Sequence, residues 1–195
     1  MPDSTGTLKN LLDLPDNLPV PTDDGACDHL EGSALPSIAL PSTSGRKVDL
    51  GAERGIVVVY FYPMIGRPDS PPMTGWNDIP GARGCTPQSC AFRDHHAKLK
   101  ELGATVYGAS TQPLEDQKEA AGRLHLPFEL LNDSSFEFAG ALNLPTFEYA
   151  SKKLIRRLTL IAEDGVIRKV FYPVFPPDRN AARVIEWLDA RQGAG

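Results

Sequence analysis

Two runs of consecutive apolar residues stand out in the hydrophobic pattern of the chain. Residues 56–61 read Ile-Val-Val-Val-Tyr-Phe, and residues 104–110 read Ala-Thr-Val-Tyr-Gly-Ala-Ser. β-Branched and aromatic residues without polar alternation are typical of strands that are buried on both faces. Between the two runs, apolar residues recur with helical spacing from Phe92 to Leu102, and Gly103 is suited to end that helix. The pattern therefore predicts a strand–helix–strand unit.

The flanking segments predict further alternation of strands and helices. Two short strands are expected within residues 37–50, around the turn at Ser44-Gly45. Later elements are helices at 114–124, 134–142 (with Ser134 as its cap) and 178–190, and strands at 128–131, 154–161 and 166–172. The last two strands form a hairpin. This order predicts an α/β fold, a thioredoxin-like mixed β-sheet flanked by helices on both faces.

Proline and glycine mark two segments outside this alternation. Residues 1–34 contain four prolines and the acidic pair Asp23-Asp24, so they are predicted to be an N-terminal extension of a domain at 35–195. Cys27 lies in this extension, either as a bystander thiol or with a function. Residues 63–83 hold five prolines and three glycines. A loop of this length inside a compact domain is usually functional or mobile.

Composition and charge narrow the class of protein. The 195 residues are 41% hydrophobic and 23% charged, which is ordinary for a globular domain. The net charge is −5 without a basic block, which argues against nucleic acid or an anionic membrane as the main partner. We find no apolar run of membrane-spanning length and no signal-peptide pattern, so a cytoplasmic location is expected.

The candidate chemistry lies in residues 84–94, Gly-Cys-Thr-Pro-Gln-Ser-Cys-Ala-Phe-Arg-Asp. Thr86 followed by Pro87 indicates a helix start, with a hydroxyl cap and then proline at the first helical position. Cys85 is thus placed at the positive N-terminal edge of a helix, where the reactive thiolate is favoured over the thiol. In a reducing compartment, a close cysteine pair is more often catalytic or metal-binding than a structural disulfide.

Cys90 lies five residues after Cys85, and this spacing favours a pair that acts as a redox switch over a structural disulfide. On an intact helix two such side chains point roughly 140° apart, so a disulfide between them requires the first turns to unwind. A thiolate that attacks a peroxide becomes a sulfenic acid, which a second thiol condenses to a disulfide. The four histidines do not form a zinc-ligand set with these cysteines, and no metal is expected.

Four motifs in order carry a resemblance to a known family. They are residues 84–94, Gly108-Ala-Ser-Thr-Gln112, Leu130-Leu-Asn-Asp133 and residues 156–165, Arg-Arg-Leu-Thr-Leu-Ile-Ala-Glu-Asp-Gly. Together they resemble the active-site helix and the later strands of peroxiredoxins of the bacterioferritin-comigratory (Q) type. The similarity spans about residues 35 to 190.

The resemblance implies a thiol-dependent peroxidase that acts on hydrogen peroxide or organic hydroperoxides. Cys85 would be the peroxidatic cysteine, and Cys90 the resolving cysteine of an intramolecular disulfide. Alignment on Gly165 places Arg156 at the family's active-site arginine, with Arg157 as the alternative if the register shifts by one. The resemblance further implies a thioredoxin-like reductant, no metal or organic cofactor, and a monomer or homodimer.

The chain departs from the family just before Cys85. The family places proline and then a threonine or serine three residues before the cysteine, and here these positions are Asp78 and Ala82. The upstream Tyr-Pro pair ends at Pro63, 22 residues before Cys85, so about 15 residues are inserted within 64–83. Thr74 and Thr86 are the candidates to return a hydroxyl to the site.

Two other functions remain open at this stage. The missing hydroxyl allows a redox-responsive binding or sensor protein, in which oxidation melts the helix and changes a partner surface. A thiol–disulfide oxidoreductase acting on proteins is the third possibility, although the chain lacks the Cys-x-x-Cys motif of that class.

Overall fold

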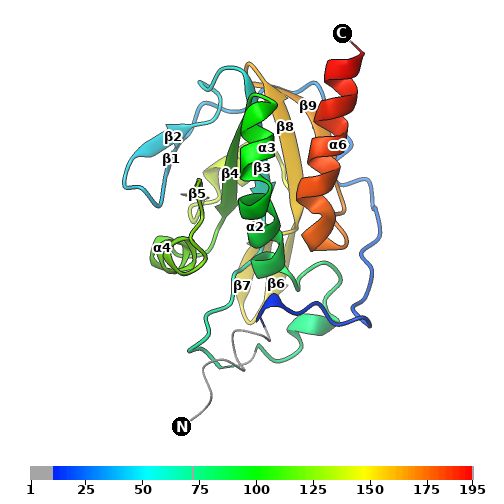
Figure 1. Cartoon of the computed structure of the whole chain (residues 1–195). Coiled ribbons are helices and arrows are strands. Elements are labelled where there is room, and N and C mark those ends of the chain that lie inside the picture. The colour runs from blue at the N-terminus through cyan, green and yellow to red at the C-terminus, as the bar shows by residue number, and fades with distance from the viewer. Residues whose placement is uncertain (1–10, 72, 195) are drawn as a thin grey trace.

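The computed structural model of the chain describes residues 11–71 and 73–194. Its central element is a five-stranded mixed sheet in the order β5-β4-β3-β8-β9 (Figure 1). The strands are β3 (Ile56–Phe61), β4 (Ala104–Ser110), β5 (Glu129–Asn132), β8 (Leu158–Glu163) and β9 (Val166–Phe171). Strands β3, β4 and β5 run parallel, whereas β8 pairs antiparallel with both β3 and β9. The predicted mixed sheet is confirmed.

Strand β3 lies in the middle of the sheet and separates two hydrophobic cores. Val57, Val59 and Phe61 face one core, whereas Val58 and Tyr60 face the other. All five are at most 2% exposed. This double burial explains why the strand shows no polar alternation in the sequence.

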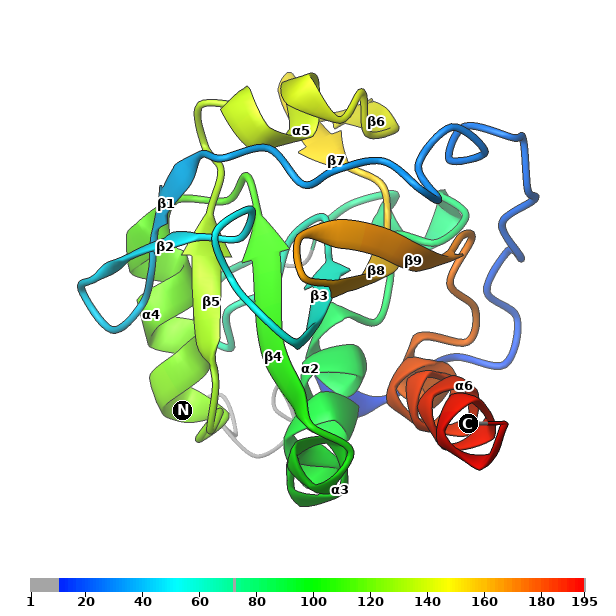
Figure 2. The same cartoon turned by 90° about the horizontal axis from the view of Figure 1, so that it is seen from above.

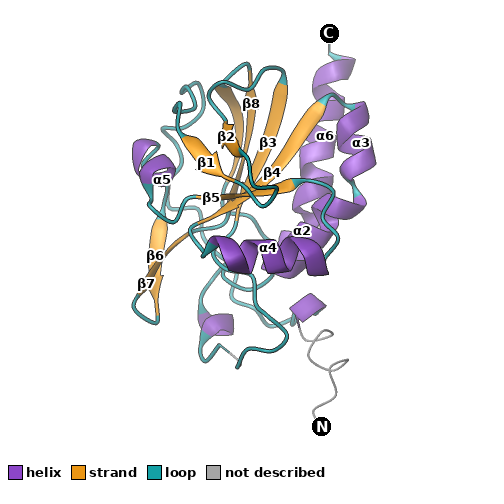
Figure 3. Ribbon diagram, turned by 90° about the vertical axis from the view of Figure 1, so that its left-hand side faces the viewer, coloured by secondary structure: helices purple, strands orange, loops and turns teal. Residues whose placement is uncertain are grey.

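Helices cover both faces of the sheet, as predicted. Helices α2 (Cys85–Asp94), α3 (His96–Glu101), α4 (Leu114–Arg123) and α6 (Asn180–Gly193) contribute to one core. Helix α5 (Glu137–Ala141) packs against the opposite face, together with residues from the N-terminal segment (Figures 2 and 3). None of the helices in residues 11–71 and 73–194 has the length and apolar character needed to cross a bilayer.

Two predicted helices differ in their boundaries. The continuous helix expected up to Leu102 is divided at His95 into α2 and α3, because the backbone of His95 leaves the helical range at φ −96° and ψ 4°. Helix α2 begins at Cys85 without a side-chain cap, so Thr86 and Pro87 lie two residues deeper in the helix than predicted. Helix α5 begins at Glu137 with Phe136 at its N-cap position, and the Asp133 carboxylate, not the predicted Ser134, accepts two N–H groups of its first turn, at 3.0 and 2.8 Å.

The strand predicted at 154–161 is also divided. Its first part belongs to a separate hairpin of β6 (Thr146–Tyr149), which was not predicted, and β7 (Lys152–Ile155). The chain then passes through Arg156 and Arg157 into β8 of the central sheet. The backbone N–H of Arg156 donates to the carbonyl of Pro145 at 2.8 Å, which fixes this crossing.

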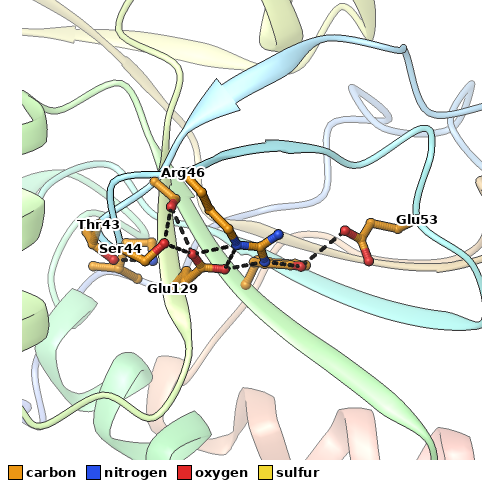
Figure 4. A network of polar contacts seen from close by, with 8 residues as sticks. Thr43, Ser44, Arg46, Glu53 and Glu129 are labelled. Carbon is orange, nitrogen blue, oxygen red and sulfur yellow. Dashed lines mark hydrogen bonds and ion pairs between the residues drawn. The ribbon is translucent and has the colours of Figure 1, made fainter.

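The predicted N-terminal strand pair is confirmed and lies beside the edge strand β5. Strands β1 (Ala39–Pro41) and β2 (Lys47–Asp49) form this antiparallel hairpin. In Figure 4, Arg46 reaches from the hairpin to Glu129 at the start of β5, with Nε 3.0 Å from the carboxylate. Ser44 donates to the same carboxylate, and Thr43 accepts the N–H of Leu130 at 3.1 Å. The network therefore fixes the hairpin on an edge that would otherwise be open to pairing.

Of the expected extension at 1–34, residues 1–10 lie outside the described residues. Its later part joins the domain, because Leu30 is fully buried in the core and the carbonyl of Ser33 accepts the N–H of Ile167 at 2.9 Å. Nearer the start, Leu14 and Pro21 pack on Gly84 and Gly81, just before helix α2. This segment therefore covers the approach to the candidate site.

Candidate active site

Cys85 is the first residue of helix α2 and is 3% exposed. The preceding Gly84 has φ 109°, a left-handed conformation in which a side chain is strained. A Cβ at Gly84 would also lie 2.3 Å from a side-chain carbon of Pro177. Glycine is therefore required here for two reasons, and the tight turn places the sulfur at the positive end of the helix.

A guanidinium group contacts the Cys85 sulfur, and it belongs to Arg157. Its Nη2 lies 3.2 Å from Sγ, and the residue is 3% exposed. Arg156, the first choice from the sequence, instead lies over the ring of Phe147, with its guanidinium carbon 5.7 Å from the ring centroid. The arginine at the sulfur is therefore Arg157, the alternative from the sequence, and not Arg156.

The correction has a local cause. Counting back from Gly165 assumes a family-like length between the arginine and the turn, and here that distance is one residue shorter. The pattern Arg157-Leu-Thr159 keeps the family's Arg-x-Thr spacing and was the better signal. Thr159 lies within β8, whereas Gly165 lies in the turn beyond it.

Backbone carbonyls before Cys85 hold the Arg157 guanidinium in place. Nε donates to the carbonyl of Gly81 at 3.2 Å, and Nη2 donates to that of Ala82 at 2.8 Å. Nη1 donates to the side chain of Gln88, which is fully buried in α2. The planar guanidinium of Arg157 can donate to all of these acceptors at once, whereas the single ammonium group of a lysine could not.

The Gln88 side chain is itself held by helix α6 and strand β8. Its amide donates to Oδ1 of Asn180 at 3.0 Å, and the hydroxyl of Thr159 donates to the same oxygen at 2.7 Å. These side chains are at most 1% exposed. A buried polar chain therefore runs from β8 and α6 through Gln88 to the guanidinium at Cys85, and a satisfied network of this kind fixes geometry.

The position of the family hydroxyl is occupied by a buried methyl group. Ala82 packs against Trp76 and Leu154, and its carbonyl oxygen lies 3.8 Å from the Cys85 sulfur. The side chain of Thr74 is exposed and its carbonyl accepts the hydroxyl of Tyr149, so the structure does not bring Thr74 to the sulfur. Thr86 lines the same small cavity as Cys85. Of the two proposed hydroxyls, only Thr86 lies at the site.

The inserted segment 64–83 is folded against the domain. It contains a 3-10 helix, η1 (Trp76–Asp78), whose tryptophan is 3% exposed. The Trp76 ring packs edge-on against Tyr149 of the β6–β7 hairpin, with centroids 4.9 Å apart. The insertion therefore forms a wall beside Cys85.

Cys90 lies inside α2 and is 8% exposed. Burial raises the pKa of its thiol, and the neighbouring Arg93 offsets part of that effect. Both Cys85 and Cys90 are free thiols on an intact helix, so their side chains point away from each other. A disulfide between them requires local unwinding.

Cys27 lies apart from this pair, in the core on the opposite face of the sheet. It is 5% exposed, and burial together with the nearby Asp24 raises the pKa of its thiol to about 12. Such a thiol is almost entirely protonated at neutral pH and therefore a poor nucleophile.

We expect Cys27 to be the unreactive thiol of the protein. The Cys27→Ala variant should keep peroxide turnover within about twofold of the wild type, because Cys27 packs in the core on the opposite face of the sheet from Cys85. In the native protein, Cys85 should react with iodoacetamide well before Cys27. Faster labelling of Cys27, measured by peptide mass spectrometry, would contradict the account of its environment.

The fold and this geometry define a class: a thioredoxin-fold thiol protein with a buried guanidinium on the sulfur of a cysteine at a helix start. Comparison with known proteins agrees. The chain matches the redoxin family over residues 30–185 and belongs to it, as a peroxiredoxin of the Q type. It is accordingly a thiol peroxidase of thioredoxin fold.

Two curated relatives illustrate the similarity. The chain is 32% identical over 161 residues to the chloroplastic peroxiredoxin Q of Sedum lineare, covering 82% of this chain and 78% of that protein. It is 31% identical over 161 residues to the chloroplastic peroxiredoxin Q of Oryza sativa subsp. japonica, covering 82% and 67%.

Solved structures share the fold. The peroxidoxin BcpB of Mycobacterium tuberculosis superposes with a TM-score of 0.66 at 25% identity, covering 83% of this chain and 98% of that one. A peroxiredoxin Q of Xanthomonas campestris gives a TM-score of 0.62 at 19% identity, covering 89% and 97%.

Proposed function

We propose that Cys85 is the peroxidatic cysteine of this thiol peroxidase and that Arg157 is its guanidinium partner. The observation that carries the assignment is the 3.2 Å contact between Arg157 Nη2 and the Cys85 sulfur. A fixed positive charge at a helix N-terminus stabilises the thiolate and the negative charge that develops on the peroxide oxygens. Arg157 replaces Arg156 in this role.

In the first step, the Cys85 thiolate attacks the terminal oxygen of the hydroperoxide. The S–O bond forms as the O–O bond breaks, and the released hydroxide or alkoxide takes up a proton to give water or an alcohol. The sulfur is oxidised to sulfenic acid and the peroxide is reduced by two electrons. Cys85 faces a cavity of about 20 Å³, which has room for one water-sized group.

In the second step, Cys90 attacks the sulfenylated Cys85. The S–S bond forms, the S–O bond breaks, and hydroxide leaves as water after protonation. The first turns of α2 unwind for this step, which releases Gln88 from Asn180 and Ser89 from its 2.9 Å hydrogen bond with Tyr60. These contacts hold the helix folded until the peroxide has reacted.

A dithiol reductant of thioredoxin type completes the cycle by taking the disulfide and leaving two thiols on the protein. A reducing compartment such as the cytoplasm suits this chemistry, and the site is complete within one chain, which is compatible with a monomer or a homodimer. The direct test is peroxide-dependent NADPH consumption with thioredoxin and thioredoxin reductase. Absence of turnover with an active donor system would contradict the proposal.

The alternative roles are not favoured. The alternative of a redox-responsive binding protein was based on the missing hydroxyl at Ala82. The contact between the Cys85 thiol and the Arg157 guanidinium is present without that hydroxyl, which favours the peroxidase. A protein thiol–disulfide oxidoreductase would use paired accessible cysteines, and both Cys85 and Cys90 are buried.

The Cys90→Ser variant is expected to stop the cycle after one turnover. Oxidation of Cys85 should proceed at the wild-type rate within about twofold, because Cys90 does not contact the peroxide or the guanidinium. The sulfenic acid should then persist and be trapped by dimedone, as seen by mass spectrometry. Cys27→Ser is the matched control and should still form the intramolecular disulfide. Sustained turnover by Cys90→Ser with thioredoxin would show that another thiol resolves the sulfenic acid.

A further inference from the structure

The small cavity at Cys85 borders a larger one that is lined mainly by the insertion. The larger cavity has a volume of about 440 Å³. Residues that line both cavities are Leu11, Met64, Gly66, Met73, Trp76 and Arg83. The two cavities are therefore adjacent, with the smaller one at the sulfur and the larger one beyond the shared wall.

The side chains of the two cavities differ in character. The shared wall holds two thioether side chains, Met64 and Met73, and the Trp76 ring, and Arg83 is its one charged side chain. Thioethers adapt to irregular apolar ligands, and indole offers a flat apolar surface. Polar side chains such as Asn77, Gln112 and Lys152 line only the larger cavity. An apolar group of substantial size therefore fits directly behind the reacting peroxide.

The wall is held in place before any substrate binds. The Gln112 side chain binds both the N–H and the carbonyl of Ile65, at 3.0 and 2.9 Å. Arg123 donates to the carbonyl of Gly66 at 3.0 Å, and Tyr149 donates to that of Thr74 at 2.9 Å. A preformed pocket loses little ordering entropy when it binds a ligand.

We propose that the inserted segment is a specificity pocket for hydroperoxides that carry a bulky apolar group. The peroxide enters the small cavity at Cys85, and its organic part packs against Met64, Met73 and Trp76. Hydrogen peroxide reaches the same sulfur but leaves this pocket unused. The inference rests on the proposed function of Cys85 and adds the residues that select among peroxides.

The test compares two peroxides on the same protein. The probes are cumene hydroperoxide and hydrogen peroxide, and the measured quantity is kcat/KM for each with the thioredoxin system. We expect the wild type to prefer cumene hydroperoxide by at least about tenfold, because even a single methylene-sized contact can contribute that much. Turnover of hydrogen peroxide without this preference would overturn the inference but not the peroxidase assignment. Failure to turn over either peroxide would instead contradict the proposed function.

Filling the pocket provides the second arm. The Ser70→Trp variant should lower kcat/KM for cumene hydroperoxide by about tenfold or more and leave hydrogen peroxide within about twofold, because Ser70 lines only the larger cavity. Asn77→Trp, which also lines only the larger cavity, is a second variant with the same expected difference between the two peroxides. Val20→Trp, on a side chain that is 66% exposed and lines neither cavity, is the matched control and should change neither value. An equal loss for both peroxides in a variant that melts like the wild type would overturn the inference.

Discussion

The Cys85→Ser variant is expected to lose peroxide turnover, by roughly a thousandfold or more, because we propose the Cys85 thiolate as the group that attacks the peroxide. Serine keeps the size and the helix start, and its hydroxyl is far less acidic than a thiol. The turn at Gly84 and the Arg157 contacts to the carbonyls of Gly81 and Ala82 do not depend on sulfur. The fold should therefore remain intact.

The measurement is peroxide-dependent NADPH consumption with excess thioredoxin, accompanied by a thermal melt of each protein. Cys27→Ser is the matched cysteine control and should turn over peroxide like the wild type. Activity in Cys85→Ser above about one-tenth of the wild-type rate would identify a different nucleophile, since nucleophile loss normally costs far more.

Loss of Arg157 is expected to have the second-largest effect. Arg157→Lys should lower kcat/KM by about a hundred- to a thousandfold, as for removal of one donor from a preorganised oxyanion site. Lysine keeps the charge but lacks the fork that reaches Gly81, Ala82 and the sulfur together. Arg157→Met should be at least as inactive and should also be less stable by about 1–3 kcal/mol, because it leaves buried carbonyls without partners.

The neighbouring Arg156→Lys variant is the matched control. Because its side chain lies over Phe147 and not at the sulfur, kcat/KM should change by no more than about twofold. The same chemical change at adjacent positions therefore separates the two assignments. A large loss of kcat/KM in Arg156→Lys together with an active Arg157→Lys would identify Arg156 as the arginine of the site and contradict the assignment of Arg157.

Much of the fold could be predicted because its signals are local. The run at residues 56–61 is buried on both faces, and the sequence shows this as an uninterrupted apolar run. The cysteine pair and the position of Cys85 at the edge of a helix could also be predicted, although the helix starts at Cys85 and not at the predicted Thr86–Pro87.

The remaining features depend on contacts between distant segments. The choice of Arg157 follows from the passage between β7 and β8, which a sequence count through the later turn could not locate. The folding of residues 64–83 against Tyr149 depends on the β6–β7 hairpin, which was not predicted. The break at His95 likewise carries no glycine or proline to announce it.

The most direct test of the central claim is peptide mapping after one equivalent of peroxide. Trypsin cuts after Arg83 and Arg93, so Cys85 and Cys90 fall within the single peptide 84–93, whereas Cys27 lies in another. The account predicts that this peptide loses the mass of two hydrogens and becomes resistant to alkylation, while Cys27 stays free. A disulfide that includes Cys27, or an unchanged peptide 84–93 after the peroxide has been consumed, would contradict it.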